Sequence, residues 1–522
     1  MSTTTLPAAQ RAIQLVGPDQ LVLNAAKTIP SPGPYQVLAR VEVTGLCFSD
    51  LKLLKQFDGH VRKSEILTAL APETLAEIPS YVPGNTPTVP GHETVVRIVA
   101  VGARVTSVKP GDRRLVQTDY RWLKTANSNA AFGYNFEGAL QEYVLMDERA
   151  ITSPDGESML IPAAADLSAS AIALVEPWAC VEDSYVVRER NAPKPGGRML
   201  TVDCATHSLA QIEMLEDAAL DDVVFLGANA DLLETLFPKV AKNGLVNIVQ
   251  RGEKFGRPVV TPVGRVHYGG VRITGTAGAN PEEGYRAIPP NGEIRPGDTI
   301  NVVGAAGPMG TMHVIRNICQ GVPDIRVWGG DMSDERLAQL MKVAGPLAKE
   351  RGVTFETYNA KTSPPAGPFS YIALMVPAPA LVAQAVDQAA PGALINIFAG
   401  IPATVSHPID LDAYVAKQAY FIGTSGSTLE DMRIVLKKVT ERSLDTNLSV
   451  AAVSGLDGAI DGIRAVEKQL IAGKILVYPS CRGLPLTPLA DLAKSHPAVH
   501  AKLRNGLWTR EAELALLAAC QS

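Results

Sequence analysis

Strand-like and helix-like segments alternate along the 522-residue chain from about residue 294 onward, and this alternation restricts the possible folds most strongly. The short valine- and isoleucine-rich runs are typical of buried strands, and the longer segments between them have helical spacing. These segments are 300–303, 309–318, 325–328, 333–343, 371–376, 381–390 and 394–398. Successive strands joined by helices require crossover connections and therefore a parallel sheet. We expect an α/β domain over residues 294–440.

A glycine-spaced turn directly follows the first of these strands. It comprises Gly304, Ala305, Ala306, Gly307, Pro308, Met309 and Gly310. Gly307 would let backbone amides approach a pyrophosphate, and Gly310 would let the following helix pack closely on the strand. The helix that begins near Pro308 would face the phosphates with its partial positive charge. The turn, although it departs from strict Gly-x-Gly-x-x-Gly, predicts a dinucleotide site.

Asp331 lies about 20 residues beyond this strand, where a carboxylate binds the ribose diol of a dinucleotide. A carboxylate there repels a 2′-phosphate, which favours NAD over NADP. Arg336 could instead accommodate that phosphate. Asp331 has an alternative role as a turn or N-cap residue before the next helix. NAD is the expected cofactor, with NADP as the alternative.

Residues 191–293 resemble a degraded second copy of this domain. Lys194-Pro-Gly-Gly matches Arg295-Pro-Gly-Asp, and residues 273–278 match residues 421–426, with glycine at the same places. The alternative is that any strand–helix–strand unit shares this rhythm. Where the second copy has its glycine turn, the first has 201–207, whose side chains would block a pyrophosphate. We expect this insertion to bind no dinucleotide and to have a structural or interface role.

Short strands broken by prolines and turns predict a compact β-rich domain over roughly residues 1–150. A helical pattern covers about 165–190, so we assign 1–190 to one domain. Residues 441–522 are expected to return to that domain and to end in a helical tail, with a helix at Arg510–Ala519.

Four side chains of the 1–190 segment could hold one open zinc site. They are Cys47, the neighbours His92 and Glu93, and Glu176, which precedes Pro177. A catalytic zinc takes about three protein ligands from thiolate, imidazole and carboxylate and leaves one position for water or substrate. Taken singly, each residue has an ordinary alternative, because a lone cysteine usually packs as a small hydrophobe. Together, they predict a metal centre.

A metal site followed by a nucleotide turn resembles the zinc-dependent medium-chain dehydrogenase/reductase family, and within it the sorbitol and polyol dehydrogenase branch. The resemblance covers about 1–190 and 294–480. It implies a GroES-like β-rich catalytic domain and a Rossmann doubly wound parallel sheet, with 191–293 as an inserted degenerate Rossmann-like half-domain. It also implies that Asp50 orients His92, that Ser49 accepts the substrate proton, and that Glu176 binds the metal directly or through water.

The chain departs from this family in three places. Residues 113–136 contain no cysteine, so the family's second, structural zinc is expected to be absent. A histidine that relays protons in some relatives would fall near Lys52. The segment between Asp50 and Gly91 is long and contains Lys52, Lys55, His60, Arg62 and Lys63. These basic residues could recognise a phosphorylated substrate or form a solvated lid face.

Composition limits the partners and the compartment. The net charge of −5 argues against nucleic acid and anionic membranes, and no apolar run is long enough to span a bilayer. Six cysteines without a Cys-x-x-Cys pair indicate a reduced, cytoplasmic protein, in which Cys180, Cys204, Cys319, Cys481 and Cys520 are unpaired thiols. The family resemblance implies a homodimer or homotetramer.

These observations predict a zinc- and NAD-dependent enzyme that interconverts a secondary alcohol of a polyol or sugar alcohol with its ketone. Two alternatives remain. One is a reductase of a sugar phosphate such as a ketose 1-phosphate, with the 52–63 stretch holding the phosphate. The other is a catalytically inactive scaffold that acts through the insertion.

Overall fold

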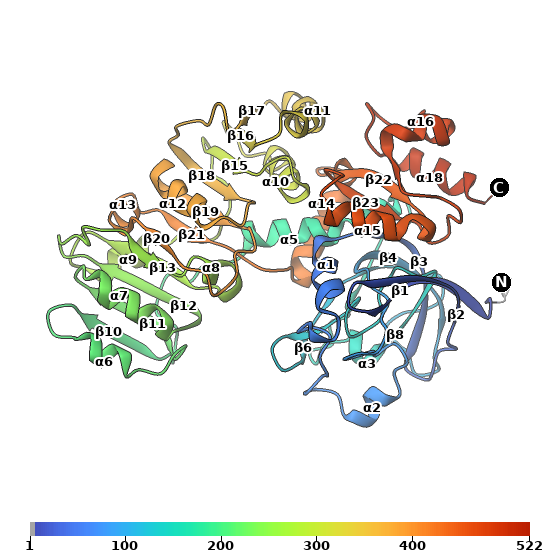
Figure 1. Cartoon of the computed structure of the whole chain (residues 1–522), viewed down its shortest axis with the longest axis horizontal. Coiled ribbons are helices and arrows are strands. Elements are labelled where there is room, and N and C mark those ends of the chain that lie inside the picture. The colour runs from blue at the N-terminus through green and yellow to red at the C-terminus, as the bar shows by residue number, and fades with distance from the viewer. Residues whose placement is uncertain (1–5, 522) are drawn as a thin grey trace. The chain divides into compact units, whose positions relative to one another are not determined.

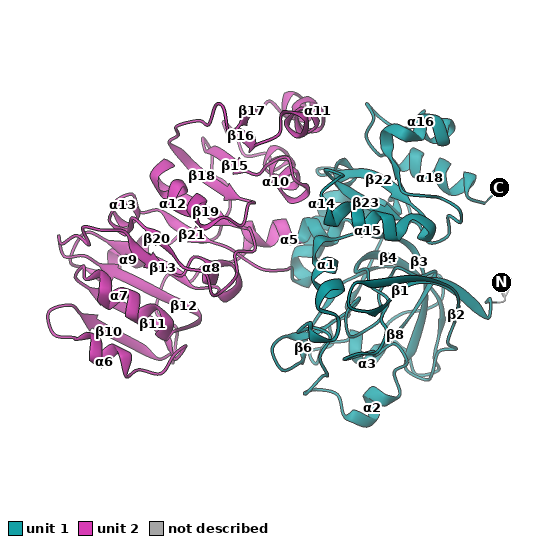
Figure 2. Cartoon of the chain, viewed as in Figure 1, with its two compact units in different colours: residues 1–179, 427–522 teal, residues 180–426 magenta. Residues whose placement is uncertain are grey.

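The computed structural model describes residues 6–521, and the chain divides into two compact units (Figure 2). Unit 1 contains residues 1–179 and 427–522, and unit 2 contains residues 180–426. The two units divide after residues 179 and 426, and the expected domain boundaries at 190 and 441 stay predictions. Helix α5 (Val175–Val186) runs across the first division. The 191–293 insertion shares a unit with the nucleotide domain.

An eight-stranded sheet forms the centre of unit 1, as the β-rich pattern predicts. Its strands are β3 (Gln36–Gly45), β4 (Glu93–Val101), β5 (Arg113–Val116), β8 (Tyr143–Asp147), β9 (Leu160–Pro162), β22 (Val450–Ser454), β23 (Lys474–Val477) and β24 (Thr487–Pro488). Strand β23 pairs with the end of β3, so the returning chain completes the sheet. The hairpin β1 (Ala9–Gly17) and β2 (Gln20–Thr28) and the pair β6 (Asp119–Lys124) and β7 (Asn129–Ala131) stand apart from it.

Short helices connect the strands of unit 1. They are α1 (Phe48–Gln56), α2 (Pro72–Ala76), α3 (Glu148–Ile151), α4 (Ala169–Ala173), α14 (Leu429–Thr440), α15 (Ala459–Glu467), α16 (Leu492–Ser495), α17 (Pro497–His500) and α18 (Arg510–Ala519) (Figure 1). The last of these confirms the helix expected at the C-terminal end.

A six-stranded sheet in unit 2 has the order β17-β16-β15-β18-β19-β21, and every neighbouring pair is parallel. The strands are β15 (Thr299–Val303), β16 (Arg326–Asp331), β17 (Thr354–Asn359), β18 (Phe369–Leu374), β19 (Ala389–Ile397) and β21 (Tyr420–Ile422). The connecting helices are α10 (Pro308–Cys319), α11 (Asp334–Arg351), α12 (Pro379–Gln388) and α13 (Leu411–Ala416). The chain moves outward from β15 in both directions, which confirms the doubly wound sheet.

The insertion forms a second parallel sheet, with the order β10-β11-β12-β14. Its strands are β10 (Met199–Asp203), β11 (Leu220–Leu226), β12 (Val240–Val249) and β14 (Arg272–Thr276), and its helices are α6 (Leu209–Glu213), α7 (Ala230–Leu236), α8 (Gly264–Gly269) and α9 (Pro281–Ala287). A short strand, β13 (Val259–Thr261), pairs with β20 (His407–Ile409) in a separate two-stranded sheet.

One expectation about the cysteines is wrong. Cys481 and Cys520 form a disulfide, with their Cα atoms 4.9 Å apart, whereas Cys47, Cys180, Cys204 and Cys319 form no disulfide. The two partners are 39 residues apart and share no motif, so only the folding back of the tail brings them together. Among residues 6–521, no helix is both long enough and apolar enough to cross a membrane.

The tail is anchored in unit 1 by a buried carboxylate, Glu513 of α18. Its two oxygens accept hydrogen bonds from the backbone amides of Ala169 and Ser170, at 2.6 and 2.7 Å. The hydroxyl of Tyr478 also donates to it, at 2.9 Å. The amides belong to the first turn of α4, which leads directly into the helix of Glu176. The tail therefore holds the segment that carries a candidate metal ligand.

Replacing Glu513 with alanine would leave two buried amides and a buried hydroxyl without acceptors. We expect the free energy of unfolding to fall by about 2–4 kcal/mol, because each buried donor without an acceptor costs roughly 1–3 kcal/mol. Urea denaturation measures this loss. The matched control is Glu511→Ala, an exposed position on the same helix, with an expected change of about 0.5 kcal/mol or less. Equal losses in the two variants would contradict the anchoring role.

Candidate metal centre and nucleotide turn

Antiparallel pairing of β3 and β4 brings the first candidate ligands together. Gly45, the last residue of β3, lies opposite Glu93, the first residue of β4. Cys47 follows two residues after Gly45 as the N-cap of α1, and His92 immediately precedes Glu93. A Cβ atom on Gly45 would lie 2.2 Å from a carboxylate oxygen of Glu93, so a side chain there would displace that carboxylate. The register of β3 against β4 therefore brings Cys47, His92 and Glu93 together.

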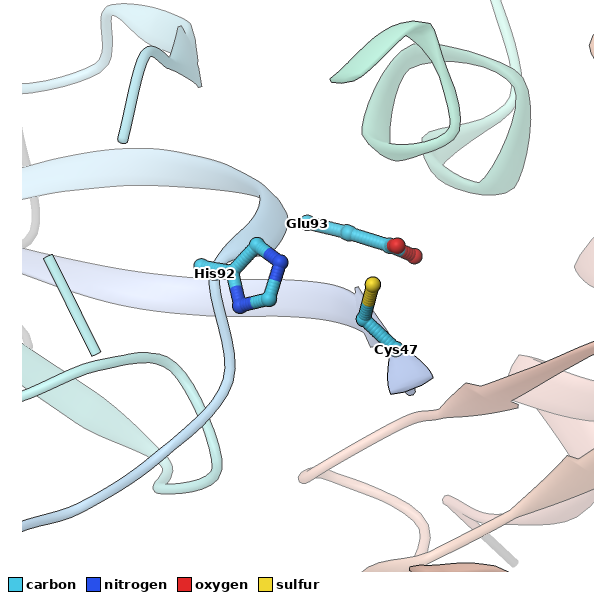
Figure 3. Close-up of side chains that lie close together, drawn as sticks. All are labelled: Cys47, His92 and Glu93. Carbon is cyan, nitrogen blue, oxygen red and sulfur yellow. The ribbon is translucent and has the colours of Figure 1, made fainter. Parts of the chain in front are cut away.

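The predicted donor set converges in the structure. One donor atom each from Cys47, His92 and Glu93 lie within 4.8 Å of one another. His92 and Glu93 are buried, and Cys47 is half-buried (Figure 3). A thiolate, an imidazole and a carboxylate at this spacing suit a four-coordinate zinc with one position left for a small molecule.

His92 is held by the residues expected to surround it. Its Nδ1 lies 3.0 Å from an Asp50 carboxylate oxygen, which leaves Nε2 directed to the metal position. Ser49 Oγ lies 3.3 Å from Nε2 and 3.2 Å from the Cys47 sulfur. Burial opposes charging of His92, but the adjacent Asp50 carboxylate raises its pKa well above the usual value. Ser49 and Asp50 thus lie where the resemblance implies.

Glu93 makes an ion pair that the sequence did not predict. Its Oε1 accepts a hydrogen bond from Lys474 Nζ at 2.5 Å, and the same ammonium donates to the Leu46 carbonyl at 3.0 Å. Both charged side chains are buried. The other carboxylate oxygen, Oε2, is buried without a hydrogen-bond partner. Such an orphaned oxygen is costly unless a cation or donor satisfies it, so the donor set fits a bound metal.

Glu176 lies near this centre but outside the group of donor atoms within 4.8 Å. Burial raises its pKa to about 7, with His92 lowering it and Glu93 raising it. These electrostatic effects indicate that its carboxylate lies in the neighbourhood of His92 and Glu93. This position is compatible with a ligand that acts through water.

Tyr134 is a further neighbour of the site that sequence reasoning missed. The centroid of its ring lies 6.0 Å from the centroid of the His92 ring. The guanidinium carbon of Arg62 lies 5.6 Å from the Tyr134 ring centroid. Burial raises the pKa of the Tyr134 hydroxyl, and a hydrogen bond with Ser49 lowers it. Arg62 also pairs with Asp119 at 2.6 Å. No local motif marks these residues, because segments far apart in the chain supply them.

The basic stretch does not form one continuous patch. Lys63 is buried and donates to the carbonyls of Val82 and Thr86, and burial lowers its pKa to about 8. Lys55 pairs with Asp19 and Glu467 at 2.7 and 2.6 Å. His60 is also buried, which lowers its pKa to about 4. The expectation that the whole stretch forms a solvated lid face is therefore wrong, because Lys63 and His60 are buried.

The nucleotide turn in unit 2 has the expected strand–turn–helix form. The amides of Gly304 and Ala305 donate to the carbonyl of Gly330 at the end of β16, and Gly307 is the N-cap of α10. A Cβ atom on Gly310 would lie 2.2 Å from the Gly304 carbonyl oxygen, so the helix packs on the turn only without a side chain there. Such close packing is what a pyrophosphate-binding turn requires.

Asp331 ends β16 and is close to Arg336. Its Oδ1 accepts hydrogen bonds from the amides of Met332 and Ser333, and its Oδ2 lies 3.6 Å from Arg336 Nη2. Ser333, and not Asp331, is the N-cap of α11. Arg336 Nε donates to the carbonyl of Ala306, so this guanidinium lies over the glycine turn. Both candidate ribose-recognition residues are thus beside the turn.

Comparison with known proteins agrees with this arrangement. Residues 33–155 match the family model described as "Alcohol dehydrogenase GroES-like domain". The chain is 29% identical to "Uncharacterized protein YggP" of Escherichia coli over 247 residues, 43% of this chain and 57% of that protein. It is 31% identical over 153 residues to the L-sorbose 1-phosphate reductase of Klebsiella pneumoniae, 29% of this chain and 36% of that protein. The chain therefore matches about half or less of these relatives' lengths.

Solved structures support the same fold. The 2R,3R-butanediol dehydrogenase of Bacillus subtilis aligns with 90% of this chain and 100% of its own length, with a TM-score of 0.55 and 16% identity. The match over residues 33–155 and the structural alignment show the fold of alcohol dehydrogenases with a GroES-like domain, in which a GroES-like unit accompanies a parallel sheet of the dinucleotide-binding type.

Proposed function

We propose that this chain is a zinc- and NAD(H)-dependent oxidoreductase that interconverts a secondary alcohol of a polyol or sugar alcohol with its ketone. The observation that carries this proposal is the convergence of Cys47, His92 and Glu93 to within 4.8 Å, with one Glu93 oxygen unpaired. A zinc bound there supplies Lewis acidity that lowers the pKa of an alcohol. Glu176 would contribute directly or through water.

Residues of the chain would hold and move the substrate proton. Asp50 holds His92 through Nδ1, which fixes the ring orientation. Ser49 Oγ, next to both Cys47 and His92, accepts the hydroxyl proton of the alcohol. Tyr134, in hydrogen-bond contact with Ser49, would relay the proton by accepting it while releasing its own hydroxyl proton to water. This route would replace the histidine relay of some relatives.

The residues of the glycine turn, 304–310, would bind the dinucleotide in unit 2. Gly307 and the N-terminus of α10 receive the pyrophosphate, and Asp331 receives the ribose hydroxyls. The carboxylate favours NAD, and the adjacent Arg336 is the group that would accept the 2′-phosphate of NADP. One zinc per chain is expected, because residues 113–136 contain no cysteine for a second site.

The test is the absorbance of reduced cofactor, followed with NAD and NADP across a panel of polyols and their phosphates. Zinc-loaded protein should reduce NAD with at least one secondary alcohol, and chelator-treated protein should not. A protein that retains zinc but oxidises no alcohol in the panel would favour the inactive scaffold.

A second candidate function, reduction of a sugar phosphate, is favoured by the position of Arg62. This guanidinium is partly exposed and stacks on Tyr134 beside the metal site. The similarity to a protein named L-sorbose 1-phosphate reductase points to the same substrate class. In this alternative, Arg62 binds the phosphate group of the substrate.

Replacing Arg62 with glutamine separates the two candidates. If Arg62 binds phosphate, KM for phosphorylated substrates should rise about 10–100-fold, because a hydrogen bond to a charged group contributes roughly 1.5–3 kcal/mol. KM for unphosphorylated polyols should stay within about twofold. The control is Lys55→Ala, which removes a positive charge from the same basic stretch. The Lys55 side chain pairs with Asp19 and Glu467. Equal effects on both substrate classes would contradict phosphate recognition.

A further inference from the structure

From β11 onward, the insertion is related to the segment from β18 onward by a constant offset of 148 residues. Gly275 in β14 and Gly423, directly after β21, occupy matching positions at this offset. The same offset relates Gly270 to Gln418, and both have a left-handed backbone, with φ of 62° and 51°. It also relates α8 to α13 within one residue. Structure as well as sequence therefore indicates two copies of one unit.

The pairing of β13 with β20 is symmetric under this offset. Val260 is paired with Pro408, which is its own counterpart 148 residues later. On either side, Val259 pairs with Ile409 and Thr261 pairs with His407. The offset of 148 residues relates Val259 to His407 and Thr261 to Ile409, so it converts one of these pairs into the other. Antiparallel pairing centred on equivalent residues is the mark of an isologous, two-fold contact.

The contacts next to the β13–β20 pair are also symmetric between the two copies. Helix α13 of one copy packs on β14 of the other, and α8 packs on β21 in return. A Cβ on Gly275 would meet Val415, and a Cβ on Gly423 would meet His267, which is the counterpart of Val415. The two edge strands, β14 and β21, contact one another. Residues of both copies share one apolar core.

The polar contacts at this junction differ between the copies. The buried Glu189 accepts from Arg272 at 2.8 Å and from the Tyr420 hydroxyl at 2.8 Å, and these two residues are counterparts. Arg272 also donates to the Gly423 carbonyl at 3.0 Å. A pair of identical copies would place the same residue at both positions. Arginine on one side and tyrosine on the other suit one specific pairing within the chain.

The first copy also lacks what a dinucleotide requires. Only 16 residues, 204–219, separate β10 from β11, whereas β15 and β18 are separated by two helices and two further strands. Those missing elements include the strand that ends at Asp331. The first copy therefore keeps the part that forms the two-fold contact and has lost the part that would bind a nucleotide.

We propose that residues 191–293 act as a covalently attached partner subunit: they cover strand β20 and the β21 edge of the nucleotide sheet, which would otherwise accept a second copy of this chain. An edge strand with unpaired backbone groups is a template for pairing with another chain. Here the insertion covers that edge. Any homo-oligomer of this protein must therefore assemble through other surfaces.

Cysteine cross-linking at the symmetry centre tests this directly, because Val260 and Pro408 are both exposed. Directly paired antiparallel residues lie about 4.5–5.5 Å apart between Cα atoms, a distance that a disulfide can span. In an isologous dimer formed through β20, Pro408→Cys alone would pair with itself across two chains. In the proposed arrangement it faces Val260 of its own chain.

After mild oxidation, full-length Pro408→Cys should keep the wild-type mass on a non-reducing gel, as should Val260→Cys, the control for random collisions. The double variant should form a 260–408 bond within one chain, identified by peptide mapping, again without a change of mass. Covalent dimers of Pro408→Cys well above the Val260→Cys level would overturn the proposal. So would a double variant with only interchain 260–408 bonds, or with none.

Discussion

Substituting alanine for His92 is expected to remove the metal and lower kcat/KM for alcohol oxidation by about 10³-fold or more, since a bound metal supplies several kcal/mol of transition-state stabilisation. The reason is geometric: His92 supplies one of three donors, and the two that remain cannot close a zinc site. Metal analysis of the purified variant and steady-state kinetics with NAD measure the two effects. The fold should persist, because His92 directly precedes β4 and belongs to neither apolar core cluster of unit 1.

Asp50→Asn is the graded comparison for this variant. It keeps all three donors but weakens the acceptor that orients His92 at 3.0 Å. Loss of such an orienting group reduces metal affinity or activity by about 10–100-fold, a smaller effect than loss of a ligand. Full zinc content and unchanged kinetics in His92→Ala would show that His92 is not a ligand.

Lys474→Met is expected to produce the largest loss of stability, and only when metal is absent. In metal-free protein the change leaves the buried Glu93 carboxylate without its partner at 2.5 Å. Breaking a buried ion pair from one side costs about 3–5 kcal/mol. When zinc is bound, the metal balances the charge of Glu93, so the loss should be smaller. Urea denaturation with and without chelator measures the difference.

The double variant Glu93→Gln/Lys474→Met is the control for Lys474→Met. Removing both charges leaves no uncompensated carboxylate, so the metal-free double variant should recover much of the stability that Lys474→Met loses. The double-mutant cycle isolates the coupling free energy between the two residues. If Lys474→Met destabilised metal-free and zinc-loaded protein equally, Glu93 would not contact the metal.

The candidate metal residues could be predicted from the sequence because each lies in a short, distinctive context. Gly-His-Glu at β4 and the cysteine after β3 are local patterns, and register then brings them together. Lys474 has no such context, since it reaches Glu93 from 381 residues away. Tyr134 was missed for the same reason. Residues that stabilise a charge from a distant strand leave no signal in spacing or periodicity.

The fold of unit 2 was predictable in outline and not in its assembly. Alternating strands and helices indicated a parallel sheet, and matched loops indicated a second copy. The two-fold pairing of β13 with β20 depends on the register of two three-residue strands. Strands this short show no hydrophobic periodicity in the sequence. The disulfide between Cys481 and Cys520 was likewise hidden, because it depends on how the tail packs.

The most direct test of the central claim is X-ray absorption of the zinc-loaded protein at the zinc edge. About one zinc per chain is expected, with one sulfur ligand at about 2.3 Å and nitrogen or oxygen ligands at about 2.0–2.2 Å. The sulfur contribution should disappear in Cys47→Ser. A metal shell without sulfur in the wild-type protein, or a preparation that takes up no zinc, would contradict a zinc site at Cys47, His92 and Glu93.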